Sequence, residues 1–243
     1  MIQTDIMGPV IMKMRPAIGG DDNVGIGITL HGEEYLLKQD PYTCIAEFVG
    51  AAVCRAVGIP ATEPCVVHLN GAPVFGSRLE AGVNAISDWF SLQNLLRKCH
   101  NINAFSAVLA VDLALGNKDR HWANWLYQTR HDGSITLRAV DFSRAWPTCH
   151  PPGKPDTVAA SENTRIAWTN WPHLGIQPDE KSAKDVTRTL ATLSGNWLDS
   201  LFNNLPVEWK VACDSPALSQ WWASQWEQHV LHVDDFIESG AWK

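Results

Sequence analysis

Five polar residues at widely separated positions have the side chains that phosphoryl transfer requires. They are Lys38, Glu47, Asp119, Asn124 and Asp141. A carboxylate such as Asp141 and an amide oxygen such as Asn124 are hard ligands of the kind that bind Mg²⁺ beside nucleotide phosphates. Lys38 could neutralise the phosphates, Glu47 could hold Lys38 in position, and Asp119 could accept the proton of an attacking hydroxyl. These residue types therefore predict a site for ATP and Mg²⁺.

The spacing of the last three residues sharpens this prediction. Asn124 follows Asp119 by five residues, which is the step between the base and the metal-binding Asn in protein-kinase catalytic loops. A predicted hairpin then leads into Asp141, as a hairpin leads into the metal-binding Asp of kinases. An Asp–Asn pair at this step arises by chance in many proteins, but the ordered set that includes the upstream Lys and Glu is much more specific.

Each residue also has a simpler structural interpretation. Lys38 could be a solvated lysine at a strand end, Asp119 and Asn124 could form turns, and Asp141 could cap a turn. The segment Gly-Asn-Lys-Asp-Arg-His-Trp-Ala-Asn nevertheless places many polar groups between two apolar elements. Buried polar groups need partners, so a ligand or an internal network is favoured. His121 in this segment either braces the loop through hydrogen bonds or takes part in catalysis.

The N-terminal third must bring Lys38 and Glu47 together. Period-two patterns predict two hairpins, one from residues 25–30 and 35–38 and one from residues 64–69 and 73–78. A helical pattern predicts one helix between them, at residues 45–57. Lys38 ends a strand of the first hairpin, and Glu47 lies on the helix. Gly58 is placed to end that helix. The pattern therefore predicts a small α+β unit.

The rest of the chain is mostly helical in pattern. A very apolar segment at 104–115 predicts a buried helix directly before the polar loop. Residues 125–129 and 135–140 predict a hairpin with Asp-Gly at its turn. Residues 147–165 contain four prolines and many polar groups, and they predict a long loop or flexible segment. From about Lys181 the pattern is helical again.

Composition excludes several classes of function. The net charge of −7 argues against a nucleic-acid-binding protein, which needs clustered Lys and Arg. Six cysteines without a CxxC pair give a zinc site little support and suit buried thiols in a reducing compartment. No signal peptide and no transmembrane segment are predicted, so we expect a cytoplasmic protein without membrane contact. The twelve tryptophans are expected to be packing anchors between helices.

The polar loop at residues 116–124 resembles the Asn-x-Asp-Arg-His-x-x-Asn catalytic loop of the HipA-like kinases, which are bacterial relatives of the phosphoinositide lipid kinases. The resemblance covers about residues 12–146. It extends upstream through Arg15-Pro16, Gly19-Gly20, Tyr35-Leu36-Leu37-Lys38, Glu47, residues 58–64 and residues 75–78. Beyond residue 150 no specific motif is present.

The resemblance implies an α+β, two-lobed protein-kinase-like fold. A small sheet-rich N-terminal lobe would span residues 1–84, and a mainly helical C-terminal lobe would span residues 85–243. The family uses ATP and magnesium, and characterised members transfer phosphate to Ser or Thr of a protein. Some members are toxins controlled by a DNA-binding antitoxin, which makes an antitoxin-type partner conceivable here.

By matching position, the resemblance also implies a role for each site residue. Lys38, Gly19 and Gly20 would contact the nucleotide phosphates. Asn124 and Asp141 would bind magnesium and, through it, the nucleotide. The catalytic set would be Asp119 as base together with Lys38, Glu47 and His121.

Three functions fit the sequence. The first is an ATP-dependent kinase that acts on protein hydroxyls. The second is a nucleotide-binding pseudokinase or scaffold without turnover, because Asp21 and Asp22 place carboxylates beside the expected phosphates and like charges repel. The third is a lipid kinase, which would need a basic or apolar membrane-facing patch and gains little support from the net charge of −7.

Overall fold

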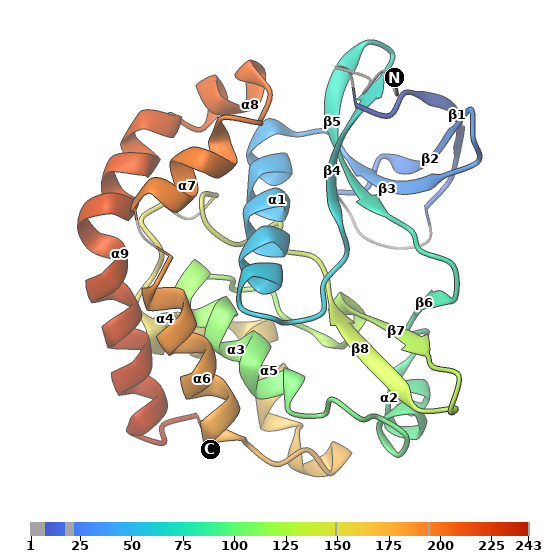
Figure 1. Cartoon of the computed structure of the whole chain (residues 1–243). Helices are drawn as coiled ribbons and strands as arrows, with labels where there is room; N and C mark the ends of the chain where they lie inside the picture. The colour runs from blue at the N-terminus through green and yellow to red at the C-terminus, as the bar shows by residue number, and fades with distance from the viewer. Residues whose placement is uncertain (1–7, 18–21, 149, 194, 243) are drawn as a thin grey trace.

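The computed structural model describes residues 8–17, 22–148, 150–193 and 195–242 of the chain. Two antiparallel sheets lie on one side of the molecule and a group of helices on the other, with helix α1 between them (Figure 1). This mixed architecture confirms the predicted α+β class, with strands first and helices later.

The N-terminal sheet has five strands in the order β1-β2-β3-β5-β4. All neighbours in it are antiparallel, and the strands are β1 (Ile11–Arg15), β2 (Gly25–Thr29), β3 (Glu34–Lys38), β4 (Pro64–Leu69) and β5 (Ala72–Arg78). Both predicted hairpins are confirmed, whereas β1 was not expected. Lys38 ends β3 opposite Phe75 of β5, so its side chain leaves from the middle of the sheet.

Helix α1 (Pro41–Ala56) carries Glu47 across this sheet. Asp40 caps its first turn by accepting a hydrogen bond from the Thr43 N–H at 2.9 Å. Pro41 fits the first helical position, where no N–H partner is needed. Because α1 also packs against α3, it joins the sheet to the helical part of the chain.

The second sheet has three strands in the order β6-β7-β8. It is formed by β6 (Val83–Ala85), β7 (Trp125–Thr129) and β8 (Ile135–Ala139). The predicted β7–β8 hairpin is confirmed, with Gly133 at φ 79° in its turn. Asn124 immediately precedes β7, and Asp141 lies two residues beyond β8. The hairpin therefore brings its two ends, and both predicted metal ligands, to one edge.

Helix α3 is the centre of the helical part. All twelve of its residues are buried, and it contacts α1, α4, α6 and α9. Gly116 ends it in the left-handed region at φ 67°. The helices of this part are α2 (Trp89–Leu96), α3 (Ala104–Leu115), α4 (Pro155–Ala159), α5 (Glu162–Thr169), α6 (Glu180–Ala191), α7 (Gly195–Phe202), α8 (Val207–Ala212) and α9 (Ser215–Glu238), with 3-10 turns η1 (Trp122–Asn124) and η2 (Pro172–Leu174).

The prediction of one long loop at residues 147–165 is wrong. Helix α4 and the start of α5 occupy its second half. Pro155 stands at the beginning of α4, where proline starts a helix instead of breaking it. Thr164 of α5 is 1% exposed. Packing against the polar loop therefore accompanies helix formation in a segment whose composition alone predicted a long loop or flexible segment.

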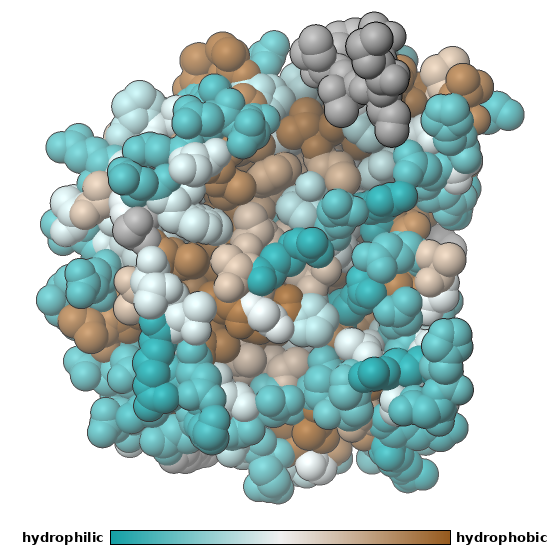
Figure 2. Space-filling model, in the orientation of Figure 1, coloured by the Kyte–Doolittle hydropathy of each residue, from teal (hydrophilic) through white to brown (hydrophobic). Residues whose placement is uncertain are grey.

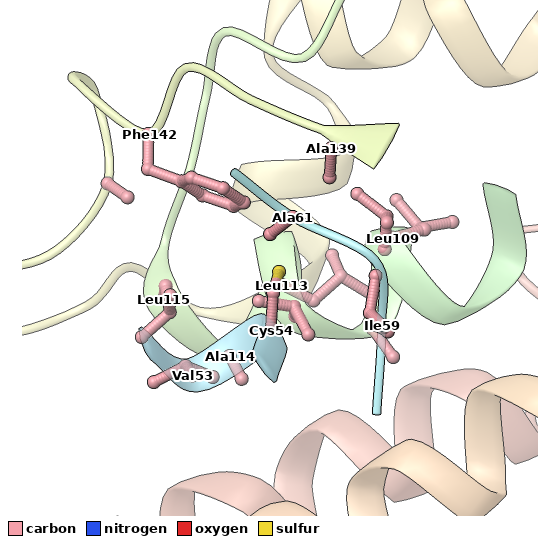
Figure 3. Close-up of a cluster of buried hydrophobic side chains, with 14 of the residues drawn as sticks. Val53, Cys54, Ile59, Ala61, Leu109, Leu113, Ala114, Leu115, Ala139 and Phe142 are labelled. Atoms are coloured by element: carbon pink, nitrogen blue, oxygen red, sulfur yellow. The ribbon is translucent and has the colours of Figure 1, made fainter. Parts of the chain in front are cut away.

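A continuous hydrophobic core joins α1, α3, the β7–β8 hairpin and the late helices. Figure 3 shows part of it, where Phe142 lies close to Cys54, Ala61 and Leu113. The prediction that tryptophans are packing anchors holds for Trp209, Trp222, Trp226 and Trp242, which are each at most 2% exposed, whereas Trp122 is 36% exposed. No helix in the described part of the chain is long and apolar enough to cross a membrane. Figure 2 shows a largely hydrophilic rim around apolar atoms near the position of α1.

Candidate active site

Lys38, Glu47 and Asp141 meet in one buried cluster. The Lys38 ammonium hydrogen-bonds to Oε1 of Glu47 and lies 2.8 Å from Oδ1 of Asp141. The side chains of Lys38 and Glu47 are each 5% exposed, and that of Asp141 is 27% exposed. Strand β3, helix α1 and the end of the β7–β8 hairpin each supply one member, so residues 103 positions apart are in contact.

The electrostatics of the cluster follow from burial and charge. Burial alone would lower the pKa of Lys38, but Glu47 and Asp141 outweigh it and raise the pKa above its ordinary value. Burial raises the pKa of Glu47 to about 7, against the opposing charge of Lys38. Burial also acts to raise the pKa of Asp141, yet Lys38 and the hydrogen bonds to the carboxylate hold it well below its ordinary value. Asp141 is therefore the ionised, partly exposed carboxylate of the site.

The backbone around Asp141 is held in an unusual conformation. Asp141 has φ 62°, in the left-handed region that few non-glycine residues adopt. The Ser143 hydroxyl donates to Oδ1 of Asp141 at 2.8 Å, and the Phe142 N–H donates to Oε2 of Glu47 at 3.0 Å. These bonds tie the turn to helix α1. Strained backbone held by its surroundings is a common feature of functional sites.

The polar loop after α3 is anchored by a buried ion pair. Arg120 donates to both carboxylate oxygens of Asp112, at 2.8 and 2.9 Å. Its remaining nitrogen donates to the carbonyls of Asn124, at 3.0 Å, and Val140, at 2.5 Å. Asn117 also donates to Asp112, at 2.8 Å. Arg120 thus joins the loop to the residue just before Asp141.

Asp119 and Asn124 are hydrogen-bonded to each other across this loop. The Asn124 side-chain amide donates to the Asp119 carbonyl at 2.8 Å, which fixes the orientation of the amide group. The Asp119 carboxylate is half-buried and accepts a bond of 2.5 Å from Asn163 of α5. His121 accepts a bond from the Ala123 N–H at 3.2 Å. This bond supports the bracing interpretation of His121, while its catalytic role stays a prediction.

The remaining predicted residues lie in or near a segment only partly covered by the structure. Gly19 and Gly20, the predicted phosphate contacts, and Asp21 lie outside the described residues. Asp22 is described, and its carboxylate lies 3.5 Å from the guanidinium of Arg144. Arg144 thus offsets the charge of one of the two carboxylates that favoured a pseudokinase.

Two residues of the site were missed by the sequence analysis. Asp112 is fully buried, and a lone carboxylate within the apolar segment 104–115 was a usable signal that a buried cation must face it. Asn163 had no such signal, because it comes from the segment wrongly predicted to be a loop. Both residues hold the polar loop in place and do not belong to the predicted metal pair.

The residues present suit a nucleotide phosphate with magnesium. Asp141 supplies an ionised carboxylate that is partly exposed, Asn124 an amide at the other end of the same hairpin, and Lys38 a cation. No group of three or more His, Cys, Asp or Glu among residues 8–17, 22–148, 150–193 and 195–242 could hold a metal ion. A carboxylate oxygen of Asp141 and the amide oxygen of Asn124 are hard donors of the kind that suit Mg²⁺.

Solved kinase structures share this arrangement of elements. No protein-family model and no curated protein matches the sequence. The proinflammatory kinase CtkA of Helicobacter pylori matches with a TM-score of 0.58 at 15% identity, over 93% of this chain and 96% of that one. HipA of Shewanella oneidensis MR-1, solved with HipB and operator DNA, matches with a TM-score of 0.56 at 12% identity, over 93% of this chain and 68% of that one. The chain therefore has the two-lobed fold of HipA-like kinases, as predicted.

Proposed function

We propose that this protein is an ATP-dependent, magnesium-requiring phosphotransferase that phosphorylates Ser or Thr hydroxyls of a protein. The observation that carries the proposal is the contact of Lys38 with both Glu47 and Asp141. A lysine paired with a glutamate of the neighbouring helix, beside a partly exposed aspartate, matches the Lys–Glu pair and the metal-binding Asp that protein kinases use.

Each residue of the site has one role in this proposal. Lys38 faces the nucleotide phosphates, and Glu47 positions Lys38. Asp141 and Asn124 would hold magnesium, which would neutralise charge on the phosphate oxygens. The acceptor hydroxyl oxygen bonds to the γ-phosphorus, the bond from that phosphorus to the ADP oxygen breaks, and Asp119 takes the hydroxyl proton.

Transfer is tested with γ-labelled ATP, magnesium and a mixture of candidate protein acceptors. The wild type is expected to label an acceptor or itself. Asp119→Ala should reduce labelling by about 10²–10⁴-fold, the usual contribution of a general base. Equal labelling by the wild type and the variant would remove Asp119 from the reaction.

Nucleotide binding is tested separately by thermal unfolding with and without Mg–ATP. The wild type should unfold at a higher temperature with Mg–ATP, because a ligand that binds only the folded state stabilises it. Asp141→Asn should reduce this increase. An unchanged increase would remove Asp141 from the metal site.

The alternative function is a pseudokinase or regulatory scaffold. The carboxylates at Asp21 and Asp22 favour it, and the contact of Asp22 with Arg144 weakens that argument. Stabilisation by Mg–ATP without transfer to any acceptor would support the scaffold. An antitoxin-type partner also stays a prediction, motivated by the likeness to HipA, which was solved with HipB.

A further inference from the structure

A cavity of about 260 Å³ lies beside the catalytic loop. Helices α2, α3 and α5, the start of strand β7, the segment around η2 and the loop itself form its walls. His121 and Trp122 line it from the loop, and Asn163, Ala167 and Trp168 line it from α5. Trp122 is 36% exposed. One of these lining residues, Asn163, also hydrogen-bonds to the proposed base Asp119.

The walls of the cavity are aromatic and nearly free of net charge. They include five tryptophans and one phenylalanine, and no Asp, Glu or Lys is among the lining residues. Arg120 is the one arginine among the lining residues, and its guanidinium is paired with the Asp112 carboxylate. Such walls favour a flat, uncharged ring, because rings pack edge-to-face or offset on other rings and a charged group would lose its hydration without gaining a partner.

Helix α5 connects the cavity to the catalytic loop through two consecutive residues. Asn163 lines the cavity and donates to Oδ1 of Asp119 at 2.5 Å. Thr164 also lines it and accepts a bond from the Arg120 N–H at 3.2 Å. A group held in the cavity therefore lies next to the side chain that orients the Asp119 carboxylate.

We propose that this cavity binds an uncharged aromatic ring, and that the ring is a side chain of the acceptor polypeptide close to its reacting hydroxyl. The first half concerns binding alone. The second half rests on the proposed function, because it assigns the ring to the acceptor whose proton Asp119 takes. The acceptor class is then a polypeptide with Trp, Tyr or Phe near its Ser or Thr.

Binding is tested without ATP, by calorimetric titration of indole and of N-acetyltryptophanamide. The second probe carries main-chain amides on the same ring. Ala167→Phe fills the cavity from α5, and Thr169→Phe places the same ring on the same helix outside the cavity. We expect the wild type and Thr169→Phe to bind both probes, and Ala167→Phe to bind each about tenfold or more weakly.

Thermal unfolding of both variants shows whether each is folded. If the wild type binds neither probe, the proposal is overturned. If Ala167→Phe is folded and binds as the wild type does, the cavity is not the site and the proposal is overturned. If the wild type binds indole but not N-acetyltryptophanamide, the cavity still binds an aromatic ring, but the assignment of that ring to a polypeptide is overturned. Because no nucleotide is present, absence of phosphotransfer leaves these results unaffected.

Discussion

At the scale of single residues, Lys38 is one cation between two carboxylates, Glu47 and Asp141. The cluster has excess negative charge when both carboxylates are ionised, and burial makes that excess costly. A proton on Glu47, whose pKa is raised to about 7, relieves it. A divalent cation at the exposed side of Asp141 would relieve it as well. The electrostatics thus favour a cation on the side of the cluster that solvent reaches.

The lowered pKa of Asp141 predicts how its contribution to stability depends on pH. A carboxylate whose folded-state pKa lies below the unfolded value of 3.8 contributes stability above that value and loses it as pH falls further. We expect Asp141→Asn to lower the free energy of unfolding by roughly 1–3 kcal/mol near pH 6, and by less near pH 3. Urea unfolding at both pH values measures the difference. An equal difference at both would contradict the prediction.

At the scale of elements, helix α1 and the turn after β8 pack closely against each other at Gly50. Glu47 and Gly50 are three residues apart and so lie on one face of α1. A Cβ at Gly50 would lie 2.2 Å from Cγ of Phe142. The Phe142 ring also lies 4.8 Å from the Arg120 guanidinium. The absence of a side chain at Gly50 therefore lets the Phe142 ring contact both α1 and Arg120 of the polar loop.

Gly50→Ala tests this close packing, because its expected effect on stability is opposite in sign to that of the same change in a solvent-exposed helix. In a solvent-exposed helix the change stabilises by about 1 kcal/mol. Here we expect it to destabilise by about 1–3 kcal/mol through overpacking and to reduce the stabilisation by Mg–ATP. Gly153→Ala is the control, since its Cβ would lie no closer than 3.4 Å to Val158. Chemical unfolding that showed Gly50→Ala to be more stable would refute the fit.

At the scale of the whole molecule, late helices pack against the N-terminal part. Helix α8 contacts α1, and the Trp209 indole donates to the Pro73 carbonyl of β5 at 3.2 Å. Trp209 is 1% exposed. The division into lobes at residues 1–84 and 85–243 stays a prediction. This indole bond joins residues on either side of it.

Trp209→Phe tests this connection by keeping a ring and removing the donor. We expect a loss of about 2–3 kcal/mol, because the change removes one hydrogen bond and part of a buried ring, with faster amide hydrogen exchange in β4 and β5. Trp242→Phe removes a local indole bond to Ile237 and should leave exchange in that sheet unchanged. Equal exchange in the two variants would show that Trp209 does not connect the sheet to α8.

Local patterns in the sequence were sufficient for most of the elements and for the outline of the site. Hairpins, helix ends and the step from Asp119 to Asn124 depend on neighbours within a few residues, which act through turn chemistry and periodicity. Local sequence patterns also placed Lys38 at a strand end, Glu47 on a helix and Asp141 beyond a hairpin. Their contact also required that α1 pack against both the sheet and α3.

Long-range packing decided the rest. Strand β1, helix α5, the bond from Asn163 to Asp119 and the fit of Phe142 against Gly50 join residues far apart in the chain. Such contacts depend on which surfaces meet and at what separation, and no local pattern contains that information. The aromatic cavity is the clearest case, because its walls come from six segments that only the folded chain brings together.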